Sequence, residues 1–382
     1  MFNLERLWVS TAILTGILLA ACGGGGGEAG SGSGGGGITA THVGVVAVPE
    51  TGVIRCTDAT GAAMDCANTG QDGDLRAGVV WPNPRFTVDG TGNCITDNLT
   101  GLMWARGDGG FRTWQLALDF ANSLDLCGFT DWRMPNRKEL LSLVNYGAAN
   151  IGIDLLNNGF TFQVESVLWS SSSITGSATE AWTLIVLPGV VSQGPKSGGN
   201  YVLPVRAAAQ AAPADLPQSG QTTCTDAAGA AIACANTGQD GNRKAGVAWP
   251  DPRFSVDGTG NCITDNLTGL IWVRNPDAAA RTWQQALEFA NGLALCGATD
   301  WRLPNINELD SLVNLEVANQ ATFLNGQGFS GVQADSYWTS SIWAGFGSGS
   351  VPLAWAVTMA SGGMGPIDRS ASRYVLPVRA RR

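Results

Sequence analysis

The sequence predicts an α+β fold that occurs twice in tandem along a chain of 382 residues. Segments with strand-like alternation and turn residues stand before and after two segments with helical periodicity, which is the order of an α+β domain. The same order of segments recurs 168 residues further along the chain. The composition agrees, because 52 Gly and 14 Trp are typical of many tight turns and aromatic packing rather than of a helical bundle.

The N-terminus carries the signals of export and lipid attachment. Arg6 precedes an apolar run that is too short to span a bilayer, and small residues lead to Cys22. The Leu-Ala-Ala-Cys ending resembles the bacterial lipoprotein signal, which implies a signal peptide over residues 1–21, a lipid on Cys22 and a Gly/Ser-rich tether over residues 22–52. An ordinary signal peptide with an incidental cysteine is the alternative. Gly23 after Cys22 predicts anchoring in the bacterial outer membrane, with either the cell surface or the periplasm open to the domains.

The repeat divides the rest of the chain into two domains of ordinary size. Residues 53–206 form the first copy, residues 221–382 form the second, and the Ala/Pro-rich residues 207–220 link them. Apart from Cys22, the cysteines form two matched sets of four, namely Cys56, Cys66, Cys94 and Cys127 in the first copy and Cys224, Cys234, Cys262 and Cys296 in the second. Even sets in an exported chain predict disulfides. Three pairings are possible in each copy, and we expect Cys56 to pair with Cys66 and Cys94 with Cys127, with the same pattern in the second copy.

The first part of each copy has strand chemistry. Cys56 and Cys66 flank a Gly turn, which predicts a short hairpin. Residues 85–88, 94–97 and 99–104 then alternate in the manner of strands and are separated by Gly-containing turns.

The middle of each copy predicts two helices. Thr113 is placed as the N-cap of a helix that begins at Trp114 and ends near Cys127. In the second copy Thr282 and Gln285 form a plausible capping box, which Leu116 breaks in the first copy.

A second helix and the closing strands complete the copy. Asn136 is placed as the N-cap of the second helix. Residues 168–172, 181–186 and 201–206 follow as strands, and Pro204 predicts that the last of them lies at an edge or carries a bulge.

Charge and composition exclude several classes of function. A net charge of -9 does not favour binding to a phosphate backbone, so no nucleic-acid partner is expected. The single histidine, His42, stands before both copies, and neither copy can therefore supply a histidine base or a histidine-rich zinc site. No Gly-rich phosphate loop is present. We expect a protein that is not an enzyme and that uses no cofactor.

Six short motifs recur in both copies in the same order. In the first copy they are Asp97-Asn98-Leu99-Thr100-Gly101-Leu102-Met103-Trp104, Thr113-Trp114, Asp131-Trp132-Arg133-Met134-Pro135-Asn136, Leu168-Trp169-Ser170-Ser171, Ala181-Trp182 and Tyr201-Val202-Leu203-Pro204-Val205-Arg206. The series resembles the DUF1566 family, also called the Lcl C-terminal domain, which is named after a Legionella collagen-like adhesin. The layout of that family is similar to the C-type-lectin-like fold, which implies twisted antiparallel strands and two helices in each copy.

The tryptophans of these motifs stand among apolar residues, so we expect them to pack in the core rather than to stack on sugars. Asp131 and Arg133 are expected to form a structural ion pair. Aromatic residues outside the repeated framework are the better candidates for ligand binding, and these are Trp343, Phe346, Phe111 and Phe329. Asp72, Asp74, Asp240 and Asn242 are weak calcium candidates, since Asp and Asn around a Gly are more often plain turns. The calcium-bridged sugar signature of the lectins is absent, and no metal is expected.

These observations predict a non-enzymatic, lipid-anchored protein whose two domains bind an extracellular glycan or protein. The alternative is a structural envelope protein whose domains contact other proteins in the outer membrane or the periplasm.

Overall fold

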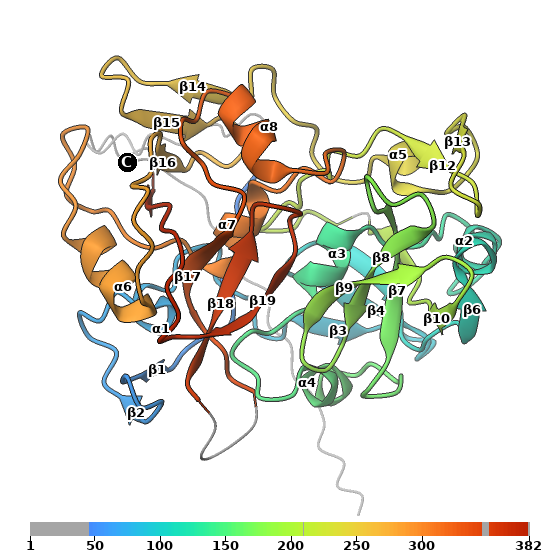
Figure 1. The fold of residues 1–382 in the computed structure, drawn as a ribbon. Helices are drawn as coiled ribbons and strands as arrows, with labels where there is room; N and C mark the ends of the chain where they lie inside the picture. Colours follow the sequence, from blue (N-terminus) through green and yellow to red (C-terminus); the bar gives the residue numbers. More distant parts are fainter. Residues whose placement is uncertain (1–45, 209, 346–350, 381–382) are drawn as a thin grey trace, which may run out of the picture. The chain divides into compact units, whose positions relative to one another are not determined.

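Each copy contains two main sheets, a two-stranded hairpin and several short helices, and the second copy repeats the order of the first (Figure 1). The computed structural model describes residues 46–208, 210–345 and 351–380, which lie in one unit, Val43–Arg382. The segments expected to form the signal peptide and most of the tether, together with Cys22 and Phe346, lie outside the described residues. No described helix is long and apolar enough to cross a membrane.

One sheet of each copy has four strands. In the first copy its order is β11 (Val205–Ala207), β5 (Leu102–Ala105), β4 (Cys94–Asp97) and β3 (Phe86–Val88). Its counterpart consists of β14 (Phe254–Val256), β15 (Cys262–Asp265), β16 (Ile271–Val273) and β20 (Val378–Arg379). Ile95 and Trp104 face each other across β4 and β5 and are fully buried, which fixes the register.

The other sheet is larger in the first copy than in the second. Its order in the first copy is β6 (Phe111–Thr113), β10 (Gly199–Tyr201), β7 (Val167–Ser173), β8 (Glu180–Ile185) and β9 (Val190–Pro195). The counterpart has β17 (Ser336–Ile342), β18 (Leu353–Thr358) and β19 (Met364–Asp368). The expectation of purely antiparallel strands is corrected at one pair, because β10 runs parallel to β7.

The closing segment, expected as one strand, is two strands in different sheets. Residues Gly199–Tyr201 pair in the larger sheet and Val205–Ala207 pair at the edge of the other. Pro204, which lacks an N–H, stands between them.

The helices include the two that were expected and a third that was not. The expected helices are α2 (Trp114–Asn122) and α3 (Arg137–Ser142), repeated as α6 (Trp283–Asn291) and α7 (Ile306–Ser311). The third is α4 (Ile151–Asn157) in the first copy and α8 (Gln320–Gly326) in the second. The side chains of Asn150 and Asn319 cap these helices by accepting a backbone N–H three residues on.

Each copy also has a leading segment with a disulfide-bonded hairpin. The first consists of β1 (Cys56–Thr57), β2 (Ala63–Met64) and the single turn α1 (Asp72–Leu75), and the second of β12 (Cys224–Thr225), β13 (Ala231–Ile232) and α5 (Asp240–Arg243). The expected disulfides are confirmed, namely Cys56–Cys66, Cys94–Cys127, Cys224–Cys234 and Cys262–Cys296.

The main hydrophobic core contains residues of both copies. Tyr146 of the first copy meets Trp355 of the second edge to face, with ring centroids 5.0 Å apart. The five tryptophans of the motifs in the first copy are buried, as expected, namely Trp104, Trp114, Trp132, Trp169 and Trp182. Because one cluster of buried side chains contains residues of both copies, the described parts of the two copies pack as one body.

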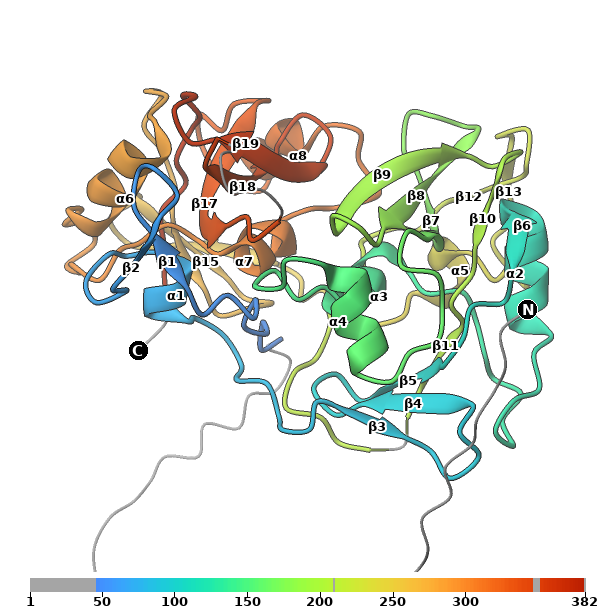
Figure 2. The ribbon, with the colours of Figure 1, turned by 90° about the horizontal axis from the view of Figure 1, so that it is seen from below.

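The copies also exchange their leading segments, residues 46–80 and 214–248. In Figures 1 and 2, α1 lies beside β17 of the second copy, and α5 lies beside β7 of the first. Asp72 accepts a hydrogen bond from Ser341, and the equivalent Asp240 accepts one from Ser172. These two contacts are equivalent in opposite senses, as at a two-fold interface, whereas the hydrogen bonds between Gln221 and Ser173 have no counterpart, because Val53 stands at the position of Gln221.

Candidate ligand-binding surface

The four aromatic candidates lie in different environments. Phe111 is on the surface, with 65% of its area exposed. Phe329 is buried and packs edge to face against Phe254 at 5.3 Å, so its ring is not offered to a surface ligand as expected. Trp343 is half-buried against the core and lines a small cavity with first-copy residues such as Tyr146. Phe346 lies outside the described residues.

The calcium candidates belong to the two single-turn helices rather than to open loops. Asp72 accepts hydrogen bonds from Thr51 and Ser341, and it is buried. Asp240 is its buried equivalent, while Asp74 accepts from the N–H of Gly70 and Asn242 from the N–H of Gly238. These side chains serve as hydrogen-bond acceptors that hold the leading segments in place.

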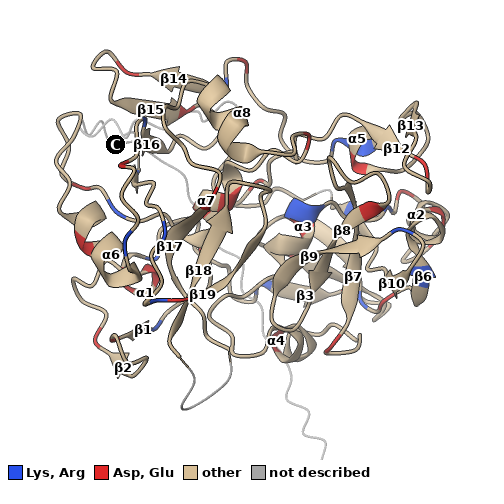
Figure 3. Ribbon diagram, viewed as in Figure 1, with Lys and Arg blue, Asp and Glu red and all other residues tan. Residues whose placement is uncertain are grey.

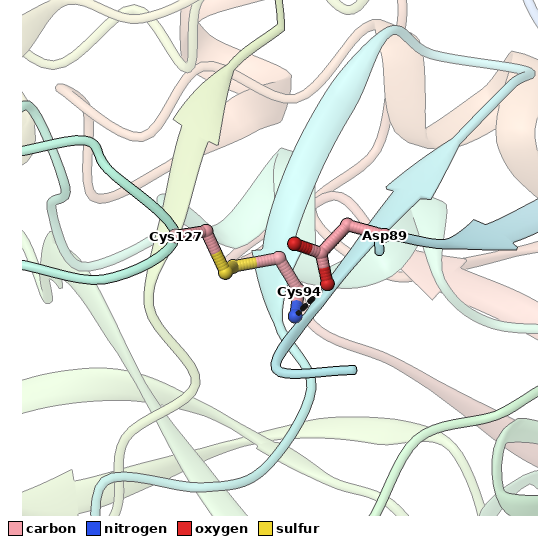
Figure 4. A group of neighbouring side chains, drawn as sticks. All are labelled: Asp89, Cys94 and Cys127. Carbon is pink, nitrogen blue, oxygen red and sulfur yellow. Dashed lines mark hydrogen bonds between the residues drawn. A yellow bond between two sulfur atoms is a disulfide. The ribbon is translucent and has the colours of Figure 1, made fainter. Parts of the chain in front are cut away.

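Another group of possible metal ligands is Asp89 with Cys94 and Cys127, and its equivalent is Asp257 with Cys262 and Cys296. Figure 4 shows that the two sulfurs are joined in a disulfide and that Asp89 accepts the N–H of Cys94, at 3.0 Å. Because neither sulfur is a free thiolate, this group offers a metal only the carboxylate. Asp89 therefore fixes the turn between β3 and β4.

Asp131 and Arg133 were expected to pair with each other, but each of them pairs with a different residue. Arg133 donates to Glu139 at 2.6 Å, and Arg206 donates to Asp131 at 2.6 Å. Glu139 also closes the capping box of α3 with Asn136. The motif, which both copies carry, thus ties the start of α3 to the closing strand, and it belongs to the framework of the fold.

Charged side chains are sparse on the ribbon, but α3 and α7 bring opposite charges together between the copies (Figure 3). Arg137 donates to Asp310 at 2.9 Å and Lys138 donates to the same carboxylate at 2.7 Å. All three side chains are buried. Burial opposes ionisation of Asp310, but the two cations outweigh it and hold the pKa of this carboxyl below its usual value. We call these three residues the interface ion cluster.

A hollow of about 720 Å³ lies beside α2 on the first copy. We call it the α2 hollow, and its walls include Phe111, Arg112, Leu116, Asp119, Phe120 and Gly199. The exposed apolar side chains in it are Phe111 and Leu116, at 65% and 57% of their areas. Exposed apolar side chains grouped in a concave surface mark a place where a ligand or partner binds.

Strand pairing holds Phe111 in this position. Phe111 stands opposite Tyr201 in the β6–β10 pair, and the two rings meet edge to face at 5.5 Å. The ring lies so close to Gly199 that a Cβ there would come within 2.1 Å of a ring carbon. Glycine at this position therefore makes room for the ring in the orientation that the structure shows.

Arg112 supplies unused hydrogen-bond donors next to the ring. Its guanidinium lies 4.3 Å from the centre of the Phe120 ring, a cation–π contact. Within the described residues no oxygen accepts a hydrogen bond from the Arg112 side chain, and its Nε is buried without a partner. Asp119, an exposed acceptor, completes the polar part of the hollow.

The second copy has the same helix but not the same surface. Ala280 and Gln285 stand at the positions of Phe111 and Leu116. Arg281 stacks on Phe289 at 3.9 Å as Arg112 stacks on Phe120, but it is paired with Asp277. The exposed ring, the exposed leucine and the unpaired guanidinium are therefore features of the first copy alone.

Sequence reasoning found part of this surface. Phe111 was a candidate because it stands outside the repeated framework, and Leu116 was noticed only as the residue that breaks a capping box. A residue that breaks a local rule without a structural gain is a signal of function, and this signal could have added Leu116. Arg112 could not be found, because its lack of a partner depends on the fold.

Comparison with known proteins supports the repeat. The model of the Lcl C-terminal domain family matches residues 93–206 and 261–379. No curated protein matches the chain. The matched ranges contain the sheet from β6 to β10, its counterpart from β17 to β19 and the helices α2 and α6, whereas the leading segments lie outside them. The chain therefore belongs to the Lcl C-terminal domain family, two copies of whose domain it carries.

Proposed function

We propose that this chain is an exported, lipid-anchored protein of the outer membrane that is not an enzyme and that binds an extracellular glycan or protein through the α2 hollow. Cys22 carries the lipid, and the Gly/Ser-rich segment after it separates the domains from the membrane. Each domain is a variant of the C-type-lectin-like fold, which hosts several kinds of binding.

The observation that carries this proposal is the difference between two otherwise matching copies. The framework is repeated down to individual capping residues, such as Asn136 and Asn305. Against this background the first copy exposes Phe111 and Leu116 where the second has Ala280 and Gln285. Large apolar side chains on the surface lower the solubility of a protein. Such side chains, when they are grouped, are typical of surfaces that a partner covers.

The chemistry of the hollow suits a ring with polar edges. Phe111 offers a flat apolar face, Arg112 offers a planar fork of donors, and Asp119 offers an acceptor. A sugar ring, or an aromatic side chain beside a carbonyl, uses all three. Many anchored copies on one cell raise the strength of attachment even when each site binds weakly.

The test is a glycan and matrix-protein array probed with the oxidised fragment from residue 39 onward, with and without calcium and at two salt concentrations. The informative variant replaces Phe111 by Ala and Leu116 by Gln, which are the residues of the second copy. We expect hits that need no calcium and that weaken about tenfold or more in the variant, since residues at the centre of a site carry most of the binding energy. In the full chain, Cys22→Ser should release the protein from the membrane fraction.

The matched control is the converse change in the second copy, Ala280→Phe with Gln285→Leu, which leaves the α2 hollow intact and should keep the hits. Binding that is unchanged in the Phe111 and Leu116 variant would sink the assignment of this surface. An array without hits, for protein shown to be folded, favours the envelope protein instead, and a pull-down from outer membranes should then recover a fixed partner that depends on the same two residues.

A further inference from the structure

A second recess lies where the two copies meet. Strands β9 and β19 are the outermost strands of their sheets, and they lie side by side (Figure 2). Among the described residues no backbone hydrogen bond joins them. A groove of about 440 Å³ opens at this junction, and both copies line it. Its size is within the range of ordinary ligand sites.

The walls of this groove combine polar and apolar groups and carry no charge. No Asp, Glu, Lys or Arg lines it. Ser192 and Gln193 on β9 and Ser336 at the start of β17 are among its lining residues, and the side chains of these three residues have no hydrogen-bond partner in the described part of the chain. Trp182, Met364 and Pro366 add apolar faces. Free hydroxyl and amide groups beside apolar faces are the chemistry that recognises a neutral sugar.

The groove is also held in shape from beneath. The guanidinium of Arg137 lies 4.7 Å from the centre of the Trp182 ring on one wall, and it donates to the carbonyl of Gly362 at 2.8 Å next to the other wall. The same guanidinium binds Asp310 in the interface ion cluster. The two walls are therefore tied together before any ligand arrives, which lowers the cost of ordering on binding.

We infer that the groove between β9 and β19 is a second binding site, which takes a neutral oligosaccharide. The uncharged lining disfavours an acidic or basic chain, because a charged group would lose its hydration without gaining a partner. An added peptide strand is disfavoured too, because Pro195 and Pro366 remove backbone donors from the two edge strands. This site is separate from the α2 hollow and does not depend on it.

The test fills the groove. Gly365 lines it, and a Cβ built on this residue meets nothing within 4 Å, so Gly365→Leu adds a side chain to open space. Gly258 has the same open surroundings in the turn between β14 and β15, and Gly258→Leu is the matched control. The probes are cellohexaose, maltohexaose, laminarihexaose and chitohexaose, with an uncharged Ser/Gln peptide and polygalacturonate beside them, and calorimetric titration measures the affinity.

We expect at least one neutral hexasaccharide to bind with one site per chain. Its affinity should be tenfold or more weaker for Gly365→Leu and unchanged for Gly258→Leu. Binding should also be unchanged in the Phe111→Ala, Leu116→Gln variant, which separates this groove from the α2 hollow. Equal binding by Gly365→Leu and the wild type overturns the inference. The inference is also overturned if none of the neutral sugars binds. It is overturned as well if only the peptide or the polygalacturonate binds and Gly365→Leu abolishes that binding.

Discussion

Two buried carboxylates, Asp72 and Asp240, join the leading segments to the opposite copies. Each is almost fully buried and is surrounded by hydroxyl donors rather than by a paired cation. Burial raises the pKa of each carboxyl to about 6, although the hydroxyl groups of Thr51, Ser341 and Ser172 partly oppose this shift. The unfolded value is about 3.9. The folded protein therefore keeps these protons to a higher pH than the unfolded chain does.

This difference sets the sign of a pH effect. The stabilisation that the neutral carboxyls provide is fully present below about pH 4 and is lost as the pH rises through about 6. Replacing both residues by Asn mimics the neutral form at every pH. We expect the double variant to be more stable than the wild type by on the order of 2–5 kcal/mol at pH 7.5, with little difference at pH 4.

Urea unfolding at the two pH values measures this difference. Asp125→Asn, at an exposed position, is the control and should show no comparable pH-dependent gain. A double variant that is less stable than the wild type at pH 7.5 would mean that the ionised carboxylates stabilise the exchange of segments, contrary to this argument.

At the scale of elements, α2 and α6 differ in how their first turns are capped. In α6, Thr282 accepts from the N–H of Gln285, whose side chain accepts from the N–H of Thr282 at 3.1 Å. In α2, the side chain of Thr113 makes no capping bond, and Leu116, at the position of the glutamine, has no group that could accept from the N–H of Thr113. Restoring a cap is worth roughly 0.5–1 kcal/mol. Leu116→Gln should therefore raise the Tm by roughly 1–3 °C.

The matched exchange is Gln285→Leu in α6, which should lower the Tm by a similar amount. Differential scanning calorimetry of both variants measures the two shifts. If Leu116→Gln lowered the Tm, the leucine would be stabilising the fold itself, and its exposure would no longer argue for a ligand.

Sequence patterns predicted the elements that have a clear start signal and missed elements that lack one. The helix α3, of six residues, was found because Asn136 and Glu139 form a capping box at its start. The helix α4, of seven residues, was missed because no capping box marks its start and Ile151–Asn157 is too short to show a helical period by itself. The strand β9 was missed because Val190–Pro195 contains Gly and Pro, which are poor strand formers, and it exists because it pairs with β8 along its whole length.

At the scale of the whole molecule, the repeat and the disulfides were readable, but the exchange of leading segments was not. Asp72 and Ser341 are distant in the sequence, and a period alone does not tell which copy a segment packs on. The sequence predicted one residue of the α2 hollow, Phe111. The groove between β9 and β19 could not be predicted, because it lies at a junction of the two copies that no local sequence pattern encodes. The limit of sequence reasoning here is the set of contacts between the copies.

The interface ion cluster favours contact between a first copy and a second copy over contact between two identical copies. Arg137 and Lys138 of the first copy correspond to Ile306 and Asn307 of the second, and Asp310 corresponds to Leu141. Two first copies facing each other would bury cations against leucine, and two second copies would bury an unpaired aspartate. Both arrangements carry the cost of a desolvated charge, so the charges favour the pairing of a first copy with a second.

Removing one partner should therefore cost far more than removing all three. Asp310→Leu leaves two buried cations without a counter-charge and should destabilise the protein by about 3–5 kcal/mol. The triple variant Arg137→Ile, Lys138→Asn, Asp310→Leu places in each copy the residues of the other, removes every charge of the cluster and should recover most of that loss, because well-packed apolar residues replace buried ion pairs with little change in stability. Denaturant unfolding of the oxidised fragment compares the three proteins. A triple variant as unstable as Asp310→Leu would show that packing around Arg137, rather than charge, holds the copies together, and that the sequence encodes their pairing through shape.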